Sequence, residues 1–274
     1  MQTDALSKTF IYILLIMGSL LMLLPFIWMI STSLKSPGEV MTMPPVWIPG
    51  DFKWENYAAA WEMAPFGRYT VNSLIVTILT TIGELITTIL AAYAFSRINF
   101  YGRDLVFAVL LGTMMVPGEV LLIPNFVTLS NLGWIDQYEA LIVPWLASIF
   151  AIFLLRQFFL GIPKELSYAA KIDGCSNFRF LWMIMVPLAK PALITIALLK
   201  AIGSWNAFLW PLIVTQSKEM RTLPVGLTSF STEAGTVYEL LMAASTMIIL
   251  PMIVLYLILQ KYIIEGVARS GIKG

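Results

Sequence analysis

Two stretches of this sequence, residues 10–30 and 240–260, carry no charged side chain over the whole length that a helix needs to cross a lipid bilayer. The hydrocarbon core requires about 20 mainly apolar residues per helix, and only helices or closed barrels satisfy their backbone hydrogen bonds there. The chain is 59% hydrophobic and only 12% charged, whereas about 25% of a typical soluble domain is charged. The sequence therefore predicts an all-α membrane protein.

Four more apolar stretches bring the expected number of transmembrane helices to six. Three of them contain one charged residue each, namely Glu84, Glu119 and Lys200, and the fourth continues past Arg156 into further aromatic residues. An outer loop over residues 33–68 and an inner loop over residues 160–190 are the longest connections. The expected spans lie at about residues 10–31, 70–95, 105–127, 139–159, 191–214 and 240–261 of a single transmembrane domain, residues 1–274.

The basic residues between the spans predict the orientation of the chain. With both termini in the cytoplasm, eleven Lys and Arg residues lie in inner segments and five in outer segments, in accord with the positive-inside rule. The inner group is Lys8, Arg97, Arg103, Arg156, Lys164, Lys171, Arg179, Lys190, Lys261, Arg269 and Lys273, and the outer group is Lys35, Lys53, Arg68, Lys218 and Arg221. We expect the first apolar stretch to remain as a span and not to be removed as a signal peptide, because no small-residue cleavage site follows it.

The outer loop is rich in Pro and Trp, with the sequence MPPVWIPGDFKWENY. Aromatic residues next to a span are typical of the membrane–water interface, where short helices lie on the bilayer. The alternative is a docking surface for an external partner, and the composition leaves both interpretations open.

Several function classes lack the residues that they would need. The chain has no histidine, the commonest metal ligand and general base, and its single cysteine, Cys175, cannot form an internal disulfide. The net charge of +1 gives no sign of nucleic-acid binding. The sequence contains no Gly-x-x-x-x-Gly-Lys-Ser/Thr loop for binding ATP. We therefore predict no catalytic residue, no metal site and no cofactor in the chain itself.

Two other kinds of membrane protein are weighed against these residues. A secondary transporter driven by an ion gradient needs several carboxylates within its spans, and only Glu84 and Glu119 lie there. An intramembrane enzyme needs a nucleophile and a base. Ser204 and Lys200 have i, i+4 spacing, but their neighbours fit a packing kink better than a catalytic pair.

The inner loop over residues 160–190 contains a short polar helix with characteristic residues at both ends. Pro163 suits the first helical position, and Glu165 in the first turn complements the helix dipole. Gly174 follows the last periodic residue, as a left-handed C-cap requires. The pattern predicts a helix of about eleven residues, which is too short to be stable alone in water.

One side of this short helix carries small apolar residues. Leu166, Ala169 and Ala170 recur at i, i+3 and i+4 and would form a flat face. Such a face fits closely into a groove of another protein, or lies on lipid headgroups, and the residues alone leave both interpretations open.

The run ELSYAAKIDGCSNFRFLWMIMVPLAKPAL resembles the EAA loop of bacterial ABC-importer permeases, whose pattern is Glu-Ala-Ala, three residues, Gly, then a hydrophobic stretch and Pro. The stretches NSLIVTIL, AAYAFSR, LLRQFFLGIPKEL, GSWNAFLWPL and MRTLPVGL are similar to the carbohydrate-uptake branch of this family, of the maltose-permease type. Tyr168 stands where the pattern has its Glu, so a salt bridge from that Glu to an ATPase has no counterpart here. The matching positions are Ala169, Ala170, Asp173, Gly174, Phe178, Pro187 and Pro191.

The resemblance implies a MetI-like fold of the type I ABC importers, with six transmembrane helices and a cytoplasmic coupling helix. It implies a multi-pass subunit of the bacterial inner membrane that passes a carbohydrate, either an oligosaccharide or a sugar derivative. The implied partners are a second homologous permease, two ATPase subunits that bind ATP and Mg, and an extracytoplasmic solute-binding protein. The residues expected to couple to the ATPase are Glu165, Tyr168, Ala169, Ala170, Lys171, Asp173, Gly174 and Phe178.

The charged and polar residues within the spans are the candidates for the translocation pathway. Lys200 lies ten residues after Lys190, which is about 15 Å along a helix, and an unpaired charge at that depth costs several kcal/mol. We expect Glu84 or a carboxylate of a partner subunit to pair with Lys200, or an anionic sugar to meet it. The full set of pathway candidates is Asn206, Ser204, Trp205, Lys200, Glu119 and Glu84.

The segment GSWNAFLWPL is expected to bend the fifth helix. Gly203 and Ser204 form a typical kink site, and Pro211 removes a backbone hydrogen bond further along. Asn206 is an amide in an apolar run, so it needs a neighbouring helix, a water molecule or a sugar hydroxyl as its partner.

Overall fold

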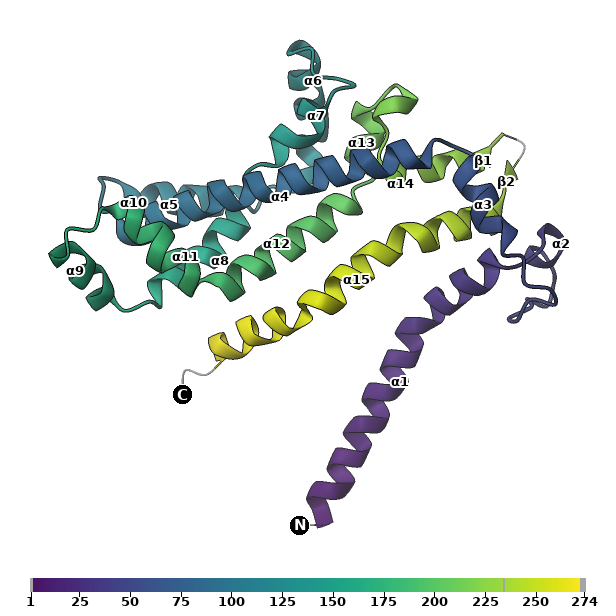
Figure 1. Ribbon diagram of the computed structural model, residues 1–274, viewed down its shortest axis with the longest axis horizontal. Helices are drawn as coiled ribbons and strands as arrows, with labels where there is room; N and C mark the ends of the chain where they lie inside the picture. The colour runs from purple at the N-terminus through teal and green to yellow at the C-terminus, as the bar shows by residue number, and fades with distance from the viewer. Residues whose placement is uncertain (1, 234, 272–274) are drawn as a thin grey trace. The chain divides into compact units, whose positions relative to one another are not determined.

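The computed structural model describes the backbone of residues 2–233 and 235–271 and the side chains of residues 7–233 and 235–261. Lys273, one of the basic residues expected inside, lies outside these ranges, as does the side chain of Arg269. The described chain is almost entirely helical (Figure 1). Its elements are α1 (Gln2–Ser33), α2 (Pro37–Val40), α3 (Glu55–Glu62), α4 (Phe66–Arg97), α5 (Arg103–Thr113), η1 (Gly118–Leu121), α6 (Leu122–Asn131), α7 (Tyr138–Ile142), η2 (Val143–Trp145), α8 (Ile149–Leu160), α9 (Lys164–Ile172), α10 (Asn177–Phe180), η3 (Leu181–Met185), α11 (Val186–Leu188), α12 (Lys190–Trp205), α13 (Leu209–Val214), η4 (Lys218–Met220), α14 (Leu223–Gly226), η5 (Leu227–Phe230), β1 (Ser231–Thr232), β2 (Gly235–Thr236) and α15 (Tyr238–Gly271).

Within the described residues, 4 helical segments are long and apolar enough to cross a membrane. Two bent helix pairs also pass the test of length and composition, so that the count rises to 6 if each pair is one span. The upper count agrees with the six spans expected from the sequence. The 4 segments are Ser7–Ser33, Phe66–Arg97, Tyr138–Leu160 and Tyr238–Lys261.

The third expected span, residues 105–127, is broken and not continuous. Arg103–Thr113 and Gly118–Asn131 meet at an angle of 89°. Pro117 lies in the break with φ −59° and ψ 131°, outside the helical region. Proline lacks an N–H and disfavours the helical conformation in the residue before it, so the helix ends there.

The fifth expected span also differs from the single helix over residues 191–214. The apolar helical segment begins before residue 191, inside the expected coupling loop over residues 160–190. It consists of Asn177–Leu188 and Lys190–Trp205, which meet at an angle of 79°. The bend falls at Ala189, between Pro187 and Pro191, each of which removes one backbone donor. Helix α12 then ends at Trp205, and helix resumes only at Leu209.

The chain forms two compact units, and the first comprises residues 1–66 and 226–251. In this unit the outer loop folds against the end of α1. The rings of Trp28 and Trp47 make an edge contact at 5.0 Å, and the amide of Asn56 donates to the carbonyl oxygens of Ser33 and Lys35 at 2.9 Å each. Short helices α2 and α3 lie in the loop, and the two interpretations of its aromatic surface remain predictions.

Lys35 is fully buried beneath this loop. Its Nζ lies 3.8 Å from the centre of the Trp28 ring, and burial lowers the pKa of the ammonium group while the Glu39 carboxylate partly opposes that shift. The first unit also contains the antiparallel pair β1–β2, in which Ser231 lies opposite Thr236.

The second unit comprises residues 67–225 and 252–274 and holds the largest described core. Helices α4, α8 and α12 supply Ile89, Leu155 and Ile196 to one apolar cluster. The same cluster extends to Ala170 in α9 and to Met185 in η3. Helix α9 is therefore packed directly onto the ends of the longer helices of this unit (Figure 1).

Candidate functional site

Helix α9 lies where the sequence predicted a polar helix, and its end has the predicted geometry. It covers Lys164–Ile172. Pro163 was expected to be its first residue, but it is the N-cap that precedes the helix. Gly174 has φ +71°, which confirms the left-handed C-cap. The N–H of Cys175 donates to the carbonyl of Ala170 at 2.8 Å and the N–H of Gly174 to that of Lys171 at 3.1 Å. These two bonds are the Schellman motif, which satisfies the last carbonyl groups of a helix.

The small apolar face of α9 is divided between the core and the surface. Ala170 is 7% exposed and packs into the core with Phe159 and Ile162 of its own chain, whereas Leu166 and Ala169 are exposed. Because α9 is amphipathic, the side that carries Ala170 has to cover the core beneath it. The side chains available to another protein also include those of Tyr168, 59% exposed, and Ile172, 86% exposed.

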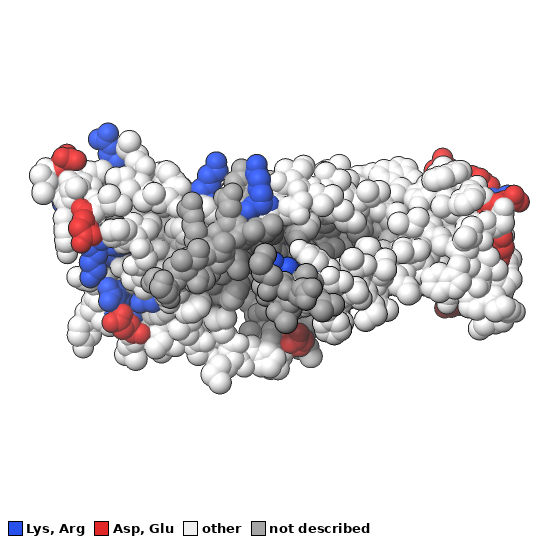
Figure 2. All heavy atoms as spheres, turned by 90° about the horizontal axis from the view of Figure 1, so that it is seen from below, with Lys and Arg blue, Asp and Glu red and all other residues white. Residues whose placement is uncertain are grey.

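The other residues expected to couple also lie at the surface of this end of the second unit. Glu165 is in the first turn of α9, Lys171 in the last turn, and Asp173 is the C-cap. Phe178 of α10 is 68% exposed, with its ring 6.1 Å from that of Trp182. Figure 2 shows Lys, Arg, Asp and Glu side chains gathered at the left end, where α9 lies, beside a mostly uncharged surface.

Glu84 and Lys200 form an ion pair inside the second unit, as expected. The Nζ of Lys200 lies 2.7 Å from Oε2 of Glu84, and the two side chains are 14% and 7% exposed. Nζ also donates to the backbone carbonyl of Trp145 at 2.8 Å. Two of the three ammonium hydrogens therefore have acceptors, and α4 is tied to α12 and η2 at one point.

The remaining pathway candidates are not assembled into one site. Ser204 accepts a hydrogen bond from Thr80 at 3.1 Å, and Trp205 is buried. Asn206 is the C-cap of α12 and is exposed. Glu119 is exposed in η1 beside the bend after α5, and within the described part of the chain its carboxylate forms no ion pair.

Sequence reasoning missed two partners in this region. The carbonyl of Trp145 could not be anticipated, because a backbone acceptor leaves no trace in residue type. Thr80 could have been found, since it lies four residues before Glu84 on the same face of α4. No group of three His, Cys, Asp or Glu side chains that could hold a metal ion occurs in the ranges that the structure describes.

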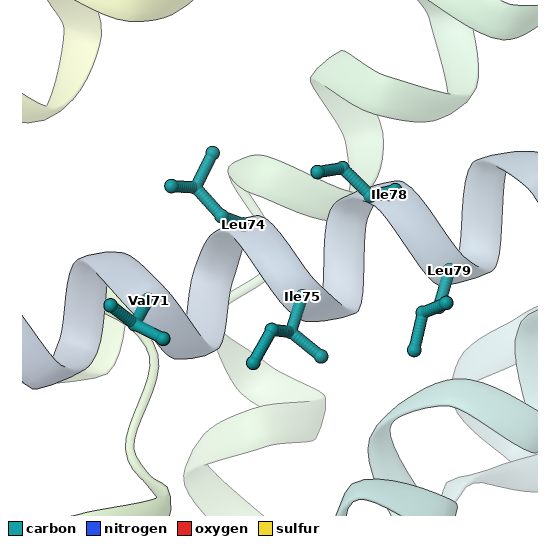
Figure 3. A pocket seen from close by; sticks show the side chains of 5 residues that line it. All are labelled: Val71, Leu74, Ile75, Ile78 and Leu79. Atoms are coloured by element: carbon teal, nitrogen blue, oxygen red, sulfur yellow. The ribbon is translucent and has the colours of Figure 1, made fainter.

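One open groove runs along α4 and has no polar lining. Val71, Leu74, Ile75, Ile78 and Leu79 form it, all from the same helix (Figure 3). A sugar needs hydrogen-bond partners for its hydroxyl groups, so this groove suits lipid chains or another membrane helix and is not a sugar site.

Asn206→Leu is expected to reduce transport more than assembly. The side chain is exposed at a break between two helices, so its loss should leave packing almost unchanged while it removes an exposed polar group. The measurement compares substrate uptake with the amount of assembled complex, and Ser204→Ala is the control, because it removes an internal hydrogen bond. Equal losses of uptake and assembly in Asn206→Leu would show that the amide is structural.

Three comparisons relate the chain to known proteins. The family model of the binding-protein-dependent transport system inner membrane component matches residues 84–269. The arabinooligosaccharides transport system permease protein AraQ of Bacillus subtilis is 37% identical over 266 residues, which is 94% of this chain and 93% of AraQ. The sn-glycerol-3-phosphate transport system permease protein UgpE of Yersinia pestis is 35% identical over 270 residues, 95% of this chain and 96% of UgpE.

Solved structures agree with this relationship. A chain from the crystal structure of a bacterial ABC transporter involved in the import of the acidic polysaccharide alginate is 27% identical, with a TM-score of 0.85 over 96% of this chain and 98% of that one. A second alginate transporter chain, crystallised with an alginate pentasaccharide-bound periplasmic protein, is 14% identical with a TM-score of 0.68 over 93% and 94% of the two chains. At that identity the likeness concerns the fold alone.

Proposed function

We propose that this chain, which belongs to the family of binding-protein-dependent transport system inner membrane components, forms half of the pathway through which a carbohydrate is imported. The chain is a permease subunit of an ABC importer and not an enzyme. The observation that carries the proposal is α9, a polar helix packed onto the ends of apolar helices with Tyr168 and Ile172 exposed.

The proposed assembly needs three kinds of partner. The family description requires a binding protein, and a second, homologous permease would form the other half of the pathway. The sequence has no phosphate loop, so two ATPase subunits would bind ATP and Mg, and one of them would dock on α9. Closure of the ATPase pair would then move α9 and switch the cavity between its inner and outer openings.

The proposed substrate is an oligosaccharide or a sugar derivative. AraQ is named for arabinooligosaccharides and the structural relative for alginate, while UgpE is named for sn-glycerol-3-phosphate. Lys200 is already paired with Glu84, so an anionic group would have to compete with that carboxylate. We therefore assign Lys200 to holding the helices together and leave substrate contacts to exposed groups such as Asn206.

The proposal is tested by purifying the chain with its second permease and ATPase subunits. The binding protein is added with the sugar that mass spectrometry finds in its purified form. We expect ATP hydrolysis to rise when the loaded binding protein is added, and that sugar to accumulate inside proteoliposomes. The proposal would be overturned if the rate of ATP hydrolysis did not change when the loaded binding protein is added and no sugar accumulated in the proteoliposomes.

The proposed orientation places both termini and α9 in the cytoplasm. Reporter fusions within residues 165–175 and within residues 40–60 should therefore report opposite sides of the membrane, the first inside and the second outside. An external position for the fusion within 165–175 would invert the orientation and remove the coupling role, because ATP is available only in the cytoplasm.

A further inference from the structure

We propose that Arg97, at the end of α4, is a positioning residue that makes α4 follow the displacement of α9. Its Nη2 atom donates to the backbone carbonyls of Phe159 and Ile162, at 2.6 Å each. Both acceptors lie in the short stretch between the last turn of α8 and the start of α9. The inference rests on the proposed function, in which the ATPase moves α9.

These two bonds add a side-chain donor to a stretch of backbone in which the N–H of Ile162 already donates to the carbonyl of Phe159 at 3.2 Å. Carbonyl groups at the end of a helix lack intrahelical donors, and the helix dipole places partial negative charge there. A guanidinium supplies both a positive charge and several donors in a fixed plane. Arg97 therefore acts as a cap for α8 that is provided by a different helix.

Helix α9 is attached to this capped stretch at both of its ends. Ile162 is separated from the first residue of α9 only by Pro163, whose ring restricts the backbone. At the other end, Ala170 packs into the same core cluster as Phe159 and Ile162. Helix α9 cannot move relative to α8 without disturbing this cluster, and Arg97 extends the attachment to α4.

Helix α4 carries the displacement toward the ion pair. Glu84 lies thirteen residues before Arg97 on the same unbroken helix, which is about 20 Å along its axis. Glu84 in turn contacts Lys200 of α12. Arg97 thus joins α9 to α4, and α4 in turn contacts α12 through Glu84 and Lys200.

A second arginine makes the reciprocal contact and provides a matched control. Arg156 of α8 donates from Nε to the carbonyl of Phe95 in the last turn of α4 at 3.1 Å, and its guanidinium lies 4.2 Å from the centre of the Phe107 ring. Both arginines join α4 to α8, but only the acceptors of Arg97 lead directly into α9. Loss of Arg156 should loosen the helix pair without releasing α9.

The test measures whether α9 and α4 move as one body in the complete complex. Nitroxide labels are placed at Lys164, the exposed first residue of α9, and at Leu90, 44% exposed on α4, in a Cys175→Ala background. Electron–electron double resonance gives the distance between the labels without nucleotide and after trapping with MgATP and vanadate. We expect the same distance in both states for the wild type and for Arg156→Gln.

In Arg97→Gln we expect the distance between the labels to shift on trapping by more than about 2 Å, the scale of helix shifts in switching proteins. A constant distance in Arg97→Gln, or an equal shift in Arg156→Gln, would overturn the proposal. If Arg97→Gln does not assemble, Arg97→Lys takes its place, because the lysine side chain is one atom shorter and its ammonium ends before the position of Nη2. A constant distance in Arg97→Lys would equally overturn the proposal.

Failure of the proposed function would look different in the same experiment. In that case the wild-type complex would hydrolyse no ATP, and the spectrum of the label at Lys164 would not change on trapping. The role of Arg97 is refuted when the wild type responds to trapping and either the Arg97 variants keep the distance constant or Arg156→Gln shifts it equally.

Discussion

A Gly174→Asp permease is expected to reach the membrane at a near-normal level and to lose stimulated ATP hydrolysis and uptake together, each by about tenfold or more. Gly174 has φ +71°, and an added Cβ would meet no atom within 4 Å. The left-handed backbone alone costs a residue with a Cβ about 1 kcal/mol, which is roughly fivefold in an equilibrium. We expect the remaining loss to come from a carboxylate at the end of α9, the proposed docking site of the ATPase.

The matched control separates strain from docking. Gly133, after α6, also has φ +71° and open space around its Cβ position, so Gly133→Asp carries the same strain and the same charge away from α9. We expect it to retain most of its stimulated hydrolysis. If both variants lose the same activity, strain explains the loss; if Gly174→Asp keeps normal stimulated hydrolysis, α9 is only a helix at the membrane surface.

The structure changes what is expected of a second substitution at Ala170. If Ala170 lay on the docking surface, a bulky residue there would add little to Gly174→Asp, because both changes would disturb the same contact. Since Ala170 is buried in the core, a large side chain would overpack it, typically at a cost of about 1–3 kcal/mol. We now expect loss of assembled protein, whereas the same change at exposed Ala169 should affect hydrolysis and not assembly.

Lys200→Met is expected to lower the amount of assembled permease severely. It leaves Glu84, only 5% exposed, without its cation. Removing one partner of a buried ion pair costs about 3–5 kcal/mol, which is a large part of the stability of a typical domain. The measurements are the membrane level of the subunit and the thermal stability of the purified complex.

The double variant Lys200→Met/Glu84→Gln is expected to restore much of that loss, because no uncompensated charge is then buried. Thermal stability of the two single variants and the double variant completes the cycle. A double variant no more stable than Lys200→Met would mean that the pair is not energetically coupled. Normal assembly and uptake in Lys200→Met alone would also contradict its role in holding the helices together.

The features predicted well from the sequence depend on local chemistry. Gly174 predicts a left-handed backbone conformation because few other residues adopt that conformation readily. The structure confirms this prediction. The pairing of Glu84 with Lys200 was predictable because an apolar environment leaves a single charge few alternatives. Long uncharged stretches gave the spans for the same reason.

The features that the sequence did not reveal depend on which neighbour each segment meets. Nothing in the spacing of Ala169 and Ala170 tells which of the two faces the core, since adjacent positions on a helix differ by about 100°. Neither the break after α5, at Pro117, nor its angle of 89° was predicted. The carbonyl acceptors of Arg97 and Lys200 belong to the backbone, so no side chain identifies them.

The distance along the chain between Glu84 and Lys200 has a consequence for biogenesis. Glu84 belongs to α4 and Lys200 to α12, more than a hundred residues later in the sequence. At about 5–20 residues per second, the ribosome makes Lys200 roughly ten seconds after Glu84. During that interval Glu84 has no cation to pair with, so α4 either enters the membrane without this partner or waits beside the translocon with its carboxylate in contact with water. Until α12, in the fifth span, has been synthesised, membrane surveillance proteases therefore meet a nascent permease in which Glu84 of α4, in the second span, lacks its partner Lys200.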